Sequence, residues 1–134
     1  MKYVLDASSL LRFLDDEAGA GRIEDLLNKA RTGGNELLLS AINWGEVVYV
    51  LVRAHGPGRA GPALDSVASL PLKIVDVTAS HAEEAAWFKE DFKVPYADAF
   101  AGALAQRENV TLVTADSDFK SVGTAIRVEF LPPK

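Results

Sequence analysis

Short apolar runs that alternate with helical stretches are the feature that most constrains the fold of this chain. Strands that alternate with helices form βαβ units, in which helices cover both faces of a parallel sheet. We therefore predict an α/β fold, a three-layer α/β/α sandwich around a five-stranded parallel sheet. The five predicted strands are residues 3–5, 36–39, 73–77, 111–114 and 127–131.

The segments between these runs carry helical periodicity and recognisable helix ends. Apolar residues recur at helical spacing over residues 23–30, and Gly33 and Gly34 follow as a stop signal. Residues 47–52 are rich in valine, but Ser and Asn residues that cap helices precede them, so we predict a helix that continues to Gly56. Because this helix is apolar all round, we expect it to be buried on more than one side, by a second protein or as a central core helix.

Further helices are predicted in the second half of the chain. Ser80 and Glu83 have the spacing of a capping box, which would open a helix that continues to residue 92. Pro95 suits the start of the next helix, over residues 96–107, because N–H groups in the first turn have no helical partner. The turn-rich stretch 56–62 shows no domain boundary, so residues 1–134 are predicted as one domain with a single core.

Length and composition limit the class of protein and the kind of metal site. A chain of 134 residues with 49% hydrophobic and 25% charged residues is typical of a soluble globular protein. No run approaches the roughly 18 apolar residues of a membrane span, and no signal segment is recognised, so we expect a cytoplasmic protein without membrane contact. With no cysteine and two histidines far apart in the sequence, any metal ion is expected to be bound by oxygen atoms.

Four acidic residues stand where a strand ends or a helix begins: Asp6, Glu46, Asp98 and Asp116. In a parallel α/β sheet these positions meet at one edge, so the side chains are expected to converge. Local roles are the alternative: Glu46 in a capping box begun by Asn43, and the two later acids as helix-start or turn residues. Gathered carboxylates repel one another, so the set predicts a divalent cation, Mg²⁺ with Mn²⁺ as a second candidate.

Hydroxyl groups and arginines complete the predicted surroundings of the acids. Ser8, Ser9 and Thr114 are candidates to donate hydrogen bonds that orient the carboxylates or a bound water. The net charge of −5 argues against broad attraction to nucleic acid, although bound cations would supply positive charge inside an acidic pocket. Three arginines are interpreted as solvated charges rather than as contacts to an RNA backbone: Arg12, Arg53 and Arg59.

The motifs around the acids, taken together, resemble the PIN-domain family. They are LDASS at 5–9, the isolated Glu46, ADAF at 97–100 and LVTADSDF at 112–119. The resemblance covers essentially the whole chain, which is similar to VapC-type toxins of bacterial or archaeal toxin–antitoxin pairs. It implies a metal-dependent endoribonuclease that is kept silent by a small antitoxin, whose basic tail enters the acidic pocket.

The resemblance also implies roles for individual positions and partners for the chain. The family's catalytic acids, which also bind the metal ion, match Asp6, Glu46, Asp98 and Asp116. Its accessory positions match Asp118, Ser8 or Ser9, and Thr114. The implied partners are an RNA substrate, the antitoxin and a second copy of the chain in a homodimer, but no particular RNA target is implied because members differ in what they cut.

Three other functions remain open at this point. A catalytically inactive PIN-like protein would act as a protein-binding module. An Asp-based phosphatase would need a second acid two residues after Asp6, where this chain has Ser8. A receiver-like signalling domain would need an acidic pair near the first strand and a lysine after the last one, where this chain continues into Pro132. The complete set of acids favours the ribonuclease.

Overall fold

Five parallel strands form a single sheet in the computed structural model, which describes residues 1–134. The strands lie in the order β3-β2-β1-β4-β5, so the first strand of the chain is the central one. Every neighbouring pair is parallel, which confirms the predicted sheet. The strands are β1 (Lys2–Leu5), β2 (Glu36–Ser40), β3 (Lys73–Val75), β4 (Thr111–Thr114) and β5 (Val128–Phe130).

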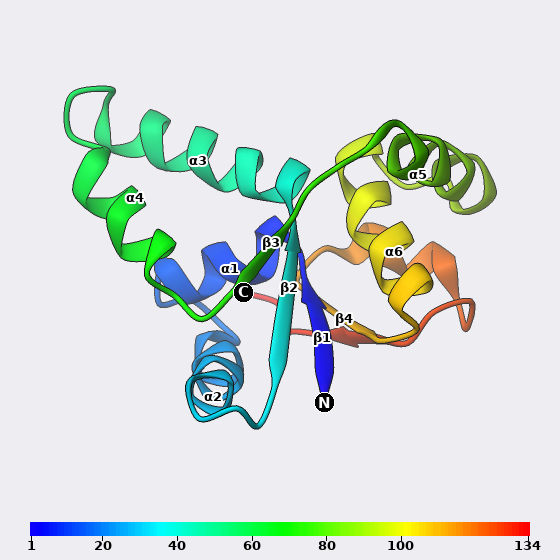
Figure 1. Cartoon of the computed structure of the whole chain (residues 1–134), viewed down its shortest axis with the longest axis horizontal. Coiled ribbons are helices and arrows are strands. Elements are labelled where there is room, and N and C mark those ends of the chain that lie inside the picture. The colour runs from blue at the N-terminus through cyan, green and yellow to red at the C-terminus, as the bar shows by residue number, and fades with distance from the viewer.

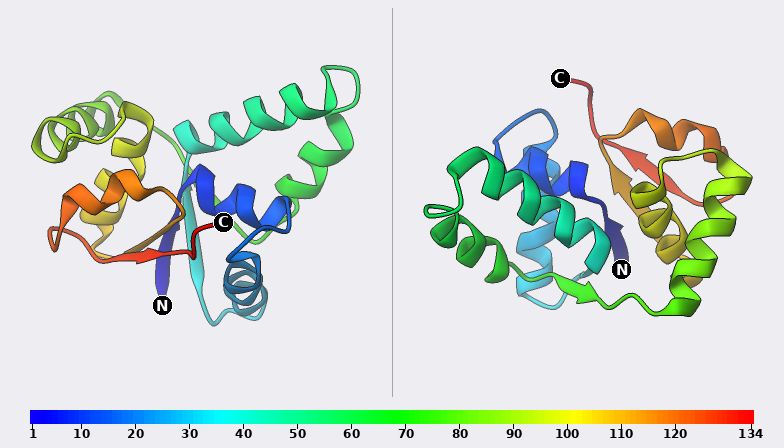
Figure 2. Two further views of the ribbon diagram at one scale, coloured as in Figure 1. Left: turned by 180° about the vertical axis from the view of Figure 1, so that it is seen from behind. Right: turned by 90° about the horizontal axis from the view of Figure 1, so that it is seen from above.

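Helices cover both faces of the sheet, which confirms the three-layer sandwich (Figure 1). One face carries α1 to α4 and the other carries α5 and α6, and Figure 2 shows the same division from behind and from above. None of the helices is both long enough and apolar enough to cross a membrane. The helices are α1 (Ala7–Leu14), α2 (Ala20–Arg31), α3 (Ala41–His55), α4 (Gly61–Ala68), α5 (Ala79–Phe92), α6 (Tyr96–Glu108) and the 3₁₀ helix η1 (Ser117–Val122).

The predicted single core is wrong: the structure has two hydrophobic cores, one on each face of the sheet, and successive residues of the central strand enter opposite ones. In β1, Tyr3 and Leu5 belong to the core under α1 to α4, whereas Val4 belongs to the core under α5 and α6. Because neighbouring side chains in a strand point to opposite faces, a sheet that is covered on both sides needs apolar residues at every position. This requirement explains why the strands are continuous apolar runs in the sequence.

The valine-rich segment is the helix α3, as predicted, but its burial is one-sided within this chain. Ser40 caps the helix, since its Oγ accepts a hydrogen bond from the N–H of Ile42 at 3.3 Å. Val47 and Leu51, one turn apart, are buried, whereas Tyr49 is 63% exposed. The alternative of a central core helix is therefore wrong, because only one stripe of α3 packs on the rest of the domain. Cover by a second protein stays a prediction.

The start of α5 differs from the predicted capping box of Ser80 and Glu83. The box is formed two residues earlier, by Thr78 and His81. Thr78 Oγ1 accepts a hydrogen bond from the N–H of His81, and His81 Nδ1 accepts one from the N–H of Thr78, both at 3.2 Å. Thr78 has the extended backbone that a cap requires, while Ser80 is already helical, so the prediction of Ser80 as the cap is wrong.

Arg12 is buried, so its interpretation as a solvated charge is wrong. Its guanidinium donates from Nη1 to the carbonyl oxygens of Ala18 and Pro132, both at 2.7 Å. These bonds tie α1 to the segment that follows β5. Arg53 and Arg59 are exposed, as expected.

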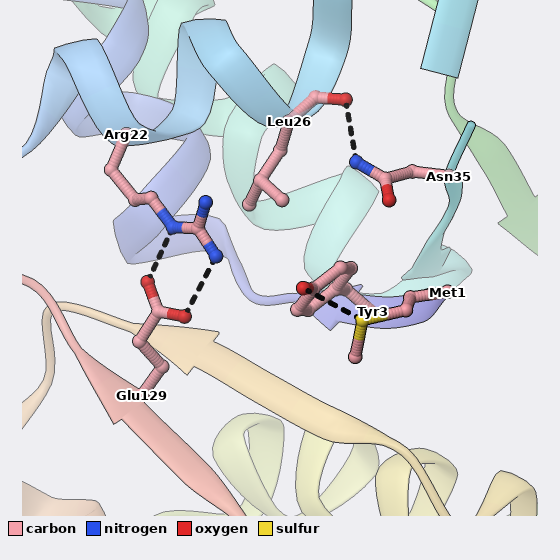
Figure 3. Close-up of polar contacts among 6 residues, drawn as sticks. All are labelled: Met1, Tyr3, Arg22, Leu26, Asn35 and Glu129. Carbon is pink, nitrogen blue, oxygen red and sulfur yellow. Dashed lines mark hydrogen bonds and ion pairs between the residues drawn. The ribbon is translucent and has the colours of Figure 1, made fainter. Parts of the chain in front are cut away.

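An ion pair joins the edge strand β5, near the C-terminus, to α2, which lies early in the chain. Arg22 donates from Nε and Nη2 to the two carboxylate oxygens of Glu129, at 2.7 and 3.1 Å (Figure 3). The guanidinium also lies 5.8 Å from the ring centre of Tyr3 in the central strand. A bidentate pair of this kind fixes geometry as well as adding attraction, so it sets the position of β5.

A prediction concerns the contact between α5 and α6. A methyl group at Gly102 would lie 2.4 Å from two ring atoms of Phe88, which is itself buried. Because the ring has no free space to move into, we expect Gly102→Ala to lower the free energy of unfolding by about 1–3 kcal/mol in urea denaturation.

The control for this change is Gly45→Ala in α3, where an added methyl group meets nothing within 4 Å. It should be neutral or stabilising by up to about 1 kcal/mol, since alanine has the higher helix propensity. A Gly102→Ala protein as stable as Gly45→Ala would contradict the close packing of α5 on α6.

Candidate active site

Asp6 lies at the end of β1 and caps the start of α1. Its side chain is almost fully buried, at 2% exposure. Oδ1 accepts hydrogen bonds from the N–H of Ser9 at 2.9 Å and from the hydroxyl of Ser8 at 2.7 Å, while Thr114 donates to Oδ2. Burial raises the pKa of Asp6, and these hydrogen bonds oppose the rise because they favour the charged form. Asp6 is thus both a helix cap and a rigidly held carboxylate.

The hydroxyls of Ser8 and Thr114 connect Asp6 to the loop that carries Asp116. β4 pairs with β1 in a register that places Thr114 beside Asp6. Each hydroxyl has one hydrogen, which it donates to Asp6, and each oxygen accepts from a backbone N–H, Ser8 from Ala115 and Thr114 from Asp116, both at 2.9 Å. The two predicted hydroxyls therefore fix one acid relative to the other.

Ser9 contacts Asp6 through both its side chain and its backbone. Its hydroxyl donates to the main-chain oxygen of Asp6 at 3.1 Å, and its backbone N–H donates to the carboxylate at 2.9 Å. Hydrogen bonds from both groups of Ser9 oppose the rise in the pKa of Asp6, and the predicted accessory role of Ser9 stays a prediction.

Asp98, Asp116 and Asp118 form the tightest group of acids in the molecule. Each of the three offers an oxygen within 4.8 Å of an oxygen of the other two. Asp116 caps the 3₁₀ helix, and its Oδ1 accepts from the N–H of Asp118 at 2.9 Å. The predicted local role of Asp116 as a cap is therefore present together with its place in the group. Asp118, predicted as an additional acid, thus also has an oxygen within 4.8 Å of Asp98.

Asp98 lies in the first turn of α6, and the charges of the other acids act on its carboxyl group. The pKa of Asp98 is raised to about 8, mainly by burial and in addition by a hydrogen bond with Asp116 and by the negative charges of Asp116, Asp6 and Glu46. Its Oδ2 is buried and has no hydrogen-bond partner. Asp6 and Glu46 lie outside the group of three acids within 4.8 Å, but they are near enough for their charges to act on Asp98.

The carboxylate of Glu46 accepts a hydrogen bond from Asn43, a residue whose role the sequence did not reveal. Asn43 Nδ2 donates to Glu46 Oε1 at 2.8 Å and to the carbonyl oxygen of Ala97 at 3.2 Å. The alternative in which Asn43 begins a capping box is wrong, because α3 is capped by Ser40 and Asn43 is already helical. The available signal was an amide one helical turn before the acid, on the same face of the helix.

The donors in this group fit a hard divalent cation. All of them are carboxylate or hydroxyl oxygens, which suit Mg²⁺ or Mn²⁺ and not a thiolate-binding metal. Asp98 Oδ2 is a buried acceptor without a partner, and a cation would satisfy it. A positive ion would also offset the repulsion that raises the pKa of Asp98.

The comparison with protein families agrees with this geometry. The sequence matches the model of the PIN domain over residues 3–125. The chain belongs to the PIN-domain family. Membership of this family sets aside the phosphatase and receiver alternatives, which belong to other families. A search of curated proteins finds no match.

Solved structures of VapC-type proteins share the fold of this PIN domain. VapBC2 from Rickettsia felis, bound to a DNA fragment from its promoter, has a TM-score of 0.75 at 20% identity, covering 98% of this chain and 100% of that one. DNA-bound VapBC from Salmonella typhimurium has a TM-score of 0.74 at 17% identity, with 97% and 98% covered. VapC20 from Mycobacterium tuberculosis, a sarcin–ricin loop cleaving toxin, has a TM-score of 0.64 at 23% identity, with 97% and 99% covered.

The raised pKa of Asp98 predicts that the metal-free protein loses stability as the pH rises toward 8. Above the ordinary pKa of an aspartate, about 4, the unfolded chain has released this proton, whereas the folded chain keeps it until the pH approaches about 8. Between about pH 4 and pH 8 the folded state therefore binds more protons than the unfolded state. The contribution of Asp98 to the free energy of unfolding decreases as the pH rises through this range.

A divalent cation should remove this loss, because it takes the place of the proton. We expect Mn²⁺ to raise the melting temperature more at about pH 8 than at about pH 5, and Asp98→Asn to reduce both the pH slope and the Mn²⁺ shift. The control is Asp65→Asn, on the exposed side of α4. Equal Mn²⁺ shifts in Asp98→Asn and in the unchanged protein would contradict the assignment of Asp98 to the metal site.

Proposed function

We propose that this PIN domain is a metal-dependent endoribonuclease that acts as the toxin of a toxin–antitoxin pair. The observation that carries the proposal is the convergence of Asp6, Glu46 and Asp116 on Asp98, whose pKa their charges raise. A fold gains no stability from keeping like charges together, so a cation-binding role accounts for the group. Family membership adds that such domains are nucleases.

The proposed metal ligands are Asp6, Asp98 and Asp116, with Glu46 binding directly or through a water. Ser8 and Thr114 hold Asp6 in place, and Asp118 adds negative charge at the outer side of the group. When bound, Mg²⁺ or Mn²⁺ would lower the pKa of a water and offset the charge that grows on the phosphate. In the proposed hydrolysis a water, and not the ribose 2′-hydroxyl, would attack the phosphorus while the 3′-oxygen leaves. The expected products therefore carry a 5′-phosphate and a 3′-hydroxyl.

An open cavity beside the acids gives room for a nucleotide. Its volume is about 410 Å³, and its lining includes Asp116 and Ser8, whose hydroxyl donates to Asp6. An RNA strand that passes through this cavity would bring a phosphodiester next to the proposed metal site. The other polar residues of the lining include Arg12, Asp15, Glu17 and Ser117.

The proposed protein partner is an antitoxin with a basic tail. The chain has a net charge of −5, and Asp98, Asp116 and Asp118 form one close group of acids, so a cationic segment would be attracted there. VapBC assemblies among the structural neighbours support a partner of this type. The exposed side of α3, which carries Tyr49, is available for the antitoxin or for a second copy in a homodimer.

The test of the nuclease proposal is cleavage of a mixed RNA pool by the purified protein. We expect cleavage with Mg²⁺ or Mn²⁺, none with a chelator, and products with 5′-phosphate ends. Asp6→Asn and Asp98→Asn should each lower the rate at least about a hundredfold, because metal binding depends on these acids. Asp65→Asn, which lies on the exposed side of α4, should cleave like the unchanged protein.

Two outcomes would contradict the nuclease proposal. The first is cleavage that continues in folded Asp98→Asn protein, and the second is a 2′,3′-cyclic phosphate as the primary product. Failure of the unchanged protein to bind Mn²⁺ would instead favour the inactive protein-binding module.

The toxin role is tested separately, by controlled expression in a bacterial host. We expect growth arrest that the Asp6→Asn change relieves, because arrest would depend on the metal site rather than on overproduction of the fold. Arrest that is equal for both proteins at matched soluble levels would contradict the toxin role. Absence of arrest in both would do the same, while leaving the nuclease proposal to the cleavage experiment.

A further inference from the structure

Asn43 joins two of the elements that carry the acids. It is fully buried, at 0% exposure, in the first turn of α3, and α3 packs directly on the start of α6. We propose that Asn43 is a positioning residue, which sets the place of the Glu46 carboxylate relative to Asp98 and thereby tunes metal binding. This inference rests on the proposed metal-dependent function and adds a residue to it.

The contacts of Asn43 use both hydrogens of its amide group. One is donated to Glu46 Oε1 at 2.8 Å and the other to the carbonyl oxygen of Ala97 at 3.2 Å. Ala97 directly precedes Asp98 in the chain, so a single NH₂ group spans the acid of α3 and the backbone next to the acid of α6. Both partners are acceptors only, so a flipped amide would lose both bonds, and the orientation is determined by its surroundings.

The bond to Glu46 also limits how its carboxylate can lie. The bond engages one oxygen of Glu46, so the rotation of the carboxylate is fixed while its second oxygen stays free of protein donors. A carboxylate held in this way is preorganised for a cation or for a water bound to one.

A purely structural role explains Asn43 poorly. Its Oδ1 is buried and has no hydrogen-bond partner, and an unmet buried acceptor destabilises a fold. A leucine has the same branched shape without polar atoms and would leave no unmet acceptor at this position. The residue is also not the helix cap, since Ser40 has that role. The donation from Nδ2 is therefore the property of Asn43 that the site uses.

The experiment compares stability with metal affinity in Asn43→Leu and Asn43→Ala. We expect Asn43→Leu to stay folded, with a cooperative urea transition, yet to bind Mn²⁺ about tenfold more weakly in calorimetric titration. Asn43→Ala, which also leaves a cavity, should be less stable but should lose a similar factor in Mn²⁺ affinity. Asn28→Leu, at an exposed position in α2, is the control and should leave Mn²⁺ affinity unchanged.

A double-substitution cycle with Glu46→Gln shows whether Asn43 acts through Glu46. If it does, Asn43→Leu should add little to the loss of Mn²⁺ affinity that Glu46→Gln causes alone. The inference is overturned if Asn43→Leu binds Mn²⁺ and cleaves RNA like the unchanged protein, or if loss of affinity follows loss of stability across the variants. If the unchanged protein neither binds Mn²⁺ nor cleaves RNA, it is the proposed function that fails.

Discussion

The hydrogen bonds that surround Asp6 are the interaction on which the rest of the site depends. A carboxylate at 2% exposure is tolerated because donors from Ser8, Ser9 and Thr114 replace the water that it has lost. One of these donors ends β4, so the network forms only when β4 lies parallel to β1 in the observed register. The same hydroxyl accepts the N–H of Asp116, which places the next acid. Topology and site geometry are thus the result of one set of contacts.

The fold and the identity of the acids could be predicted because their signals are local. Strands that are buried on both faces must be apolar throughout, and the run that contains Val4 shows this directly. Each strand ends where its apolar run stops, so Asp6 and Asp116 mark the carboxyl edge of the sheet in the sequence itself. Parallel topology then implies that they meet, although their distances from one another and from Asp98 depend on the packing of α6.

What could not be predicted depends on contacts between residues far apart in the chain. Arg12 was interpreted as a surface charge because one of its two carbonyl partners, that of Pro132, lies 120 residues away in the sequence. Asn43 reads as a helix-start residue until α6 places the carbonyl of Ala97 against it. The cap of α5 was misplaced because Ser80 is the more common type of capping residue, whereas the extended backbone that a cap requires is found at Thr78.

The length of the outer strands affects how this domain meets other molecules. β3 and β5, which form the two rims of the sheet, are three residues long, and the ion pair of Arg22 and Glu129 holds β5 against α2. An edge strand offers unpaired N–H and C=O groups to a strand of another molecule, and edge strands of three residues offer few of them. Continuation of the sheet from one molecule into the next is therefore disfavoured, which protects against strand-mediated aggregation and leaves helices and loops as the surfaces for association.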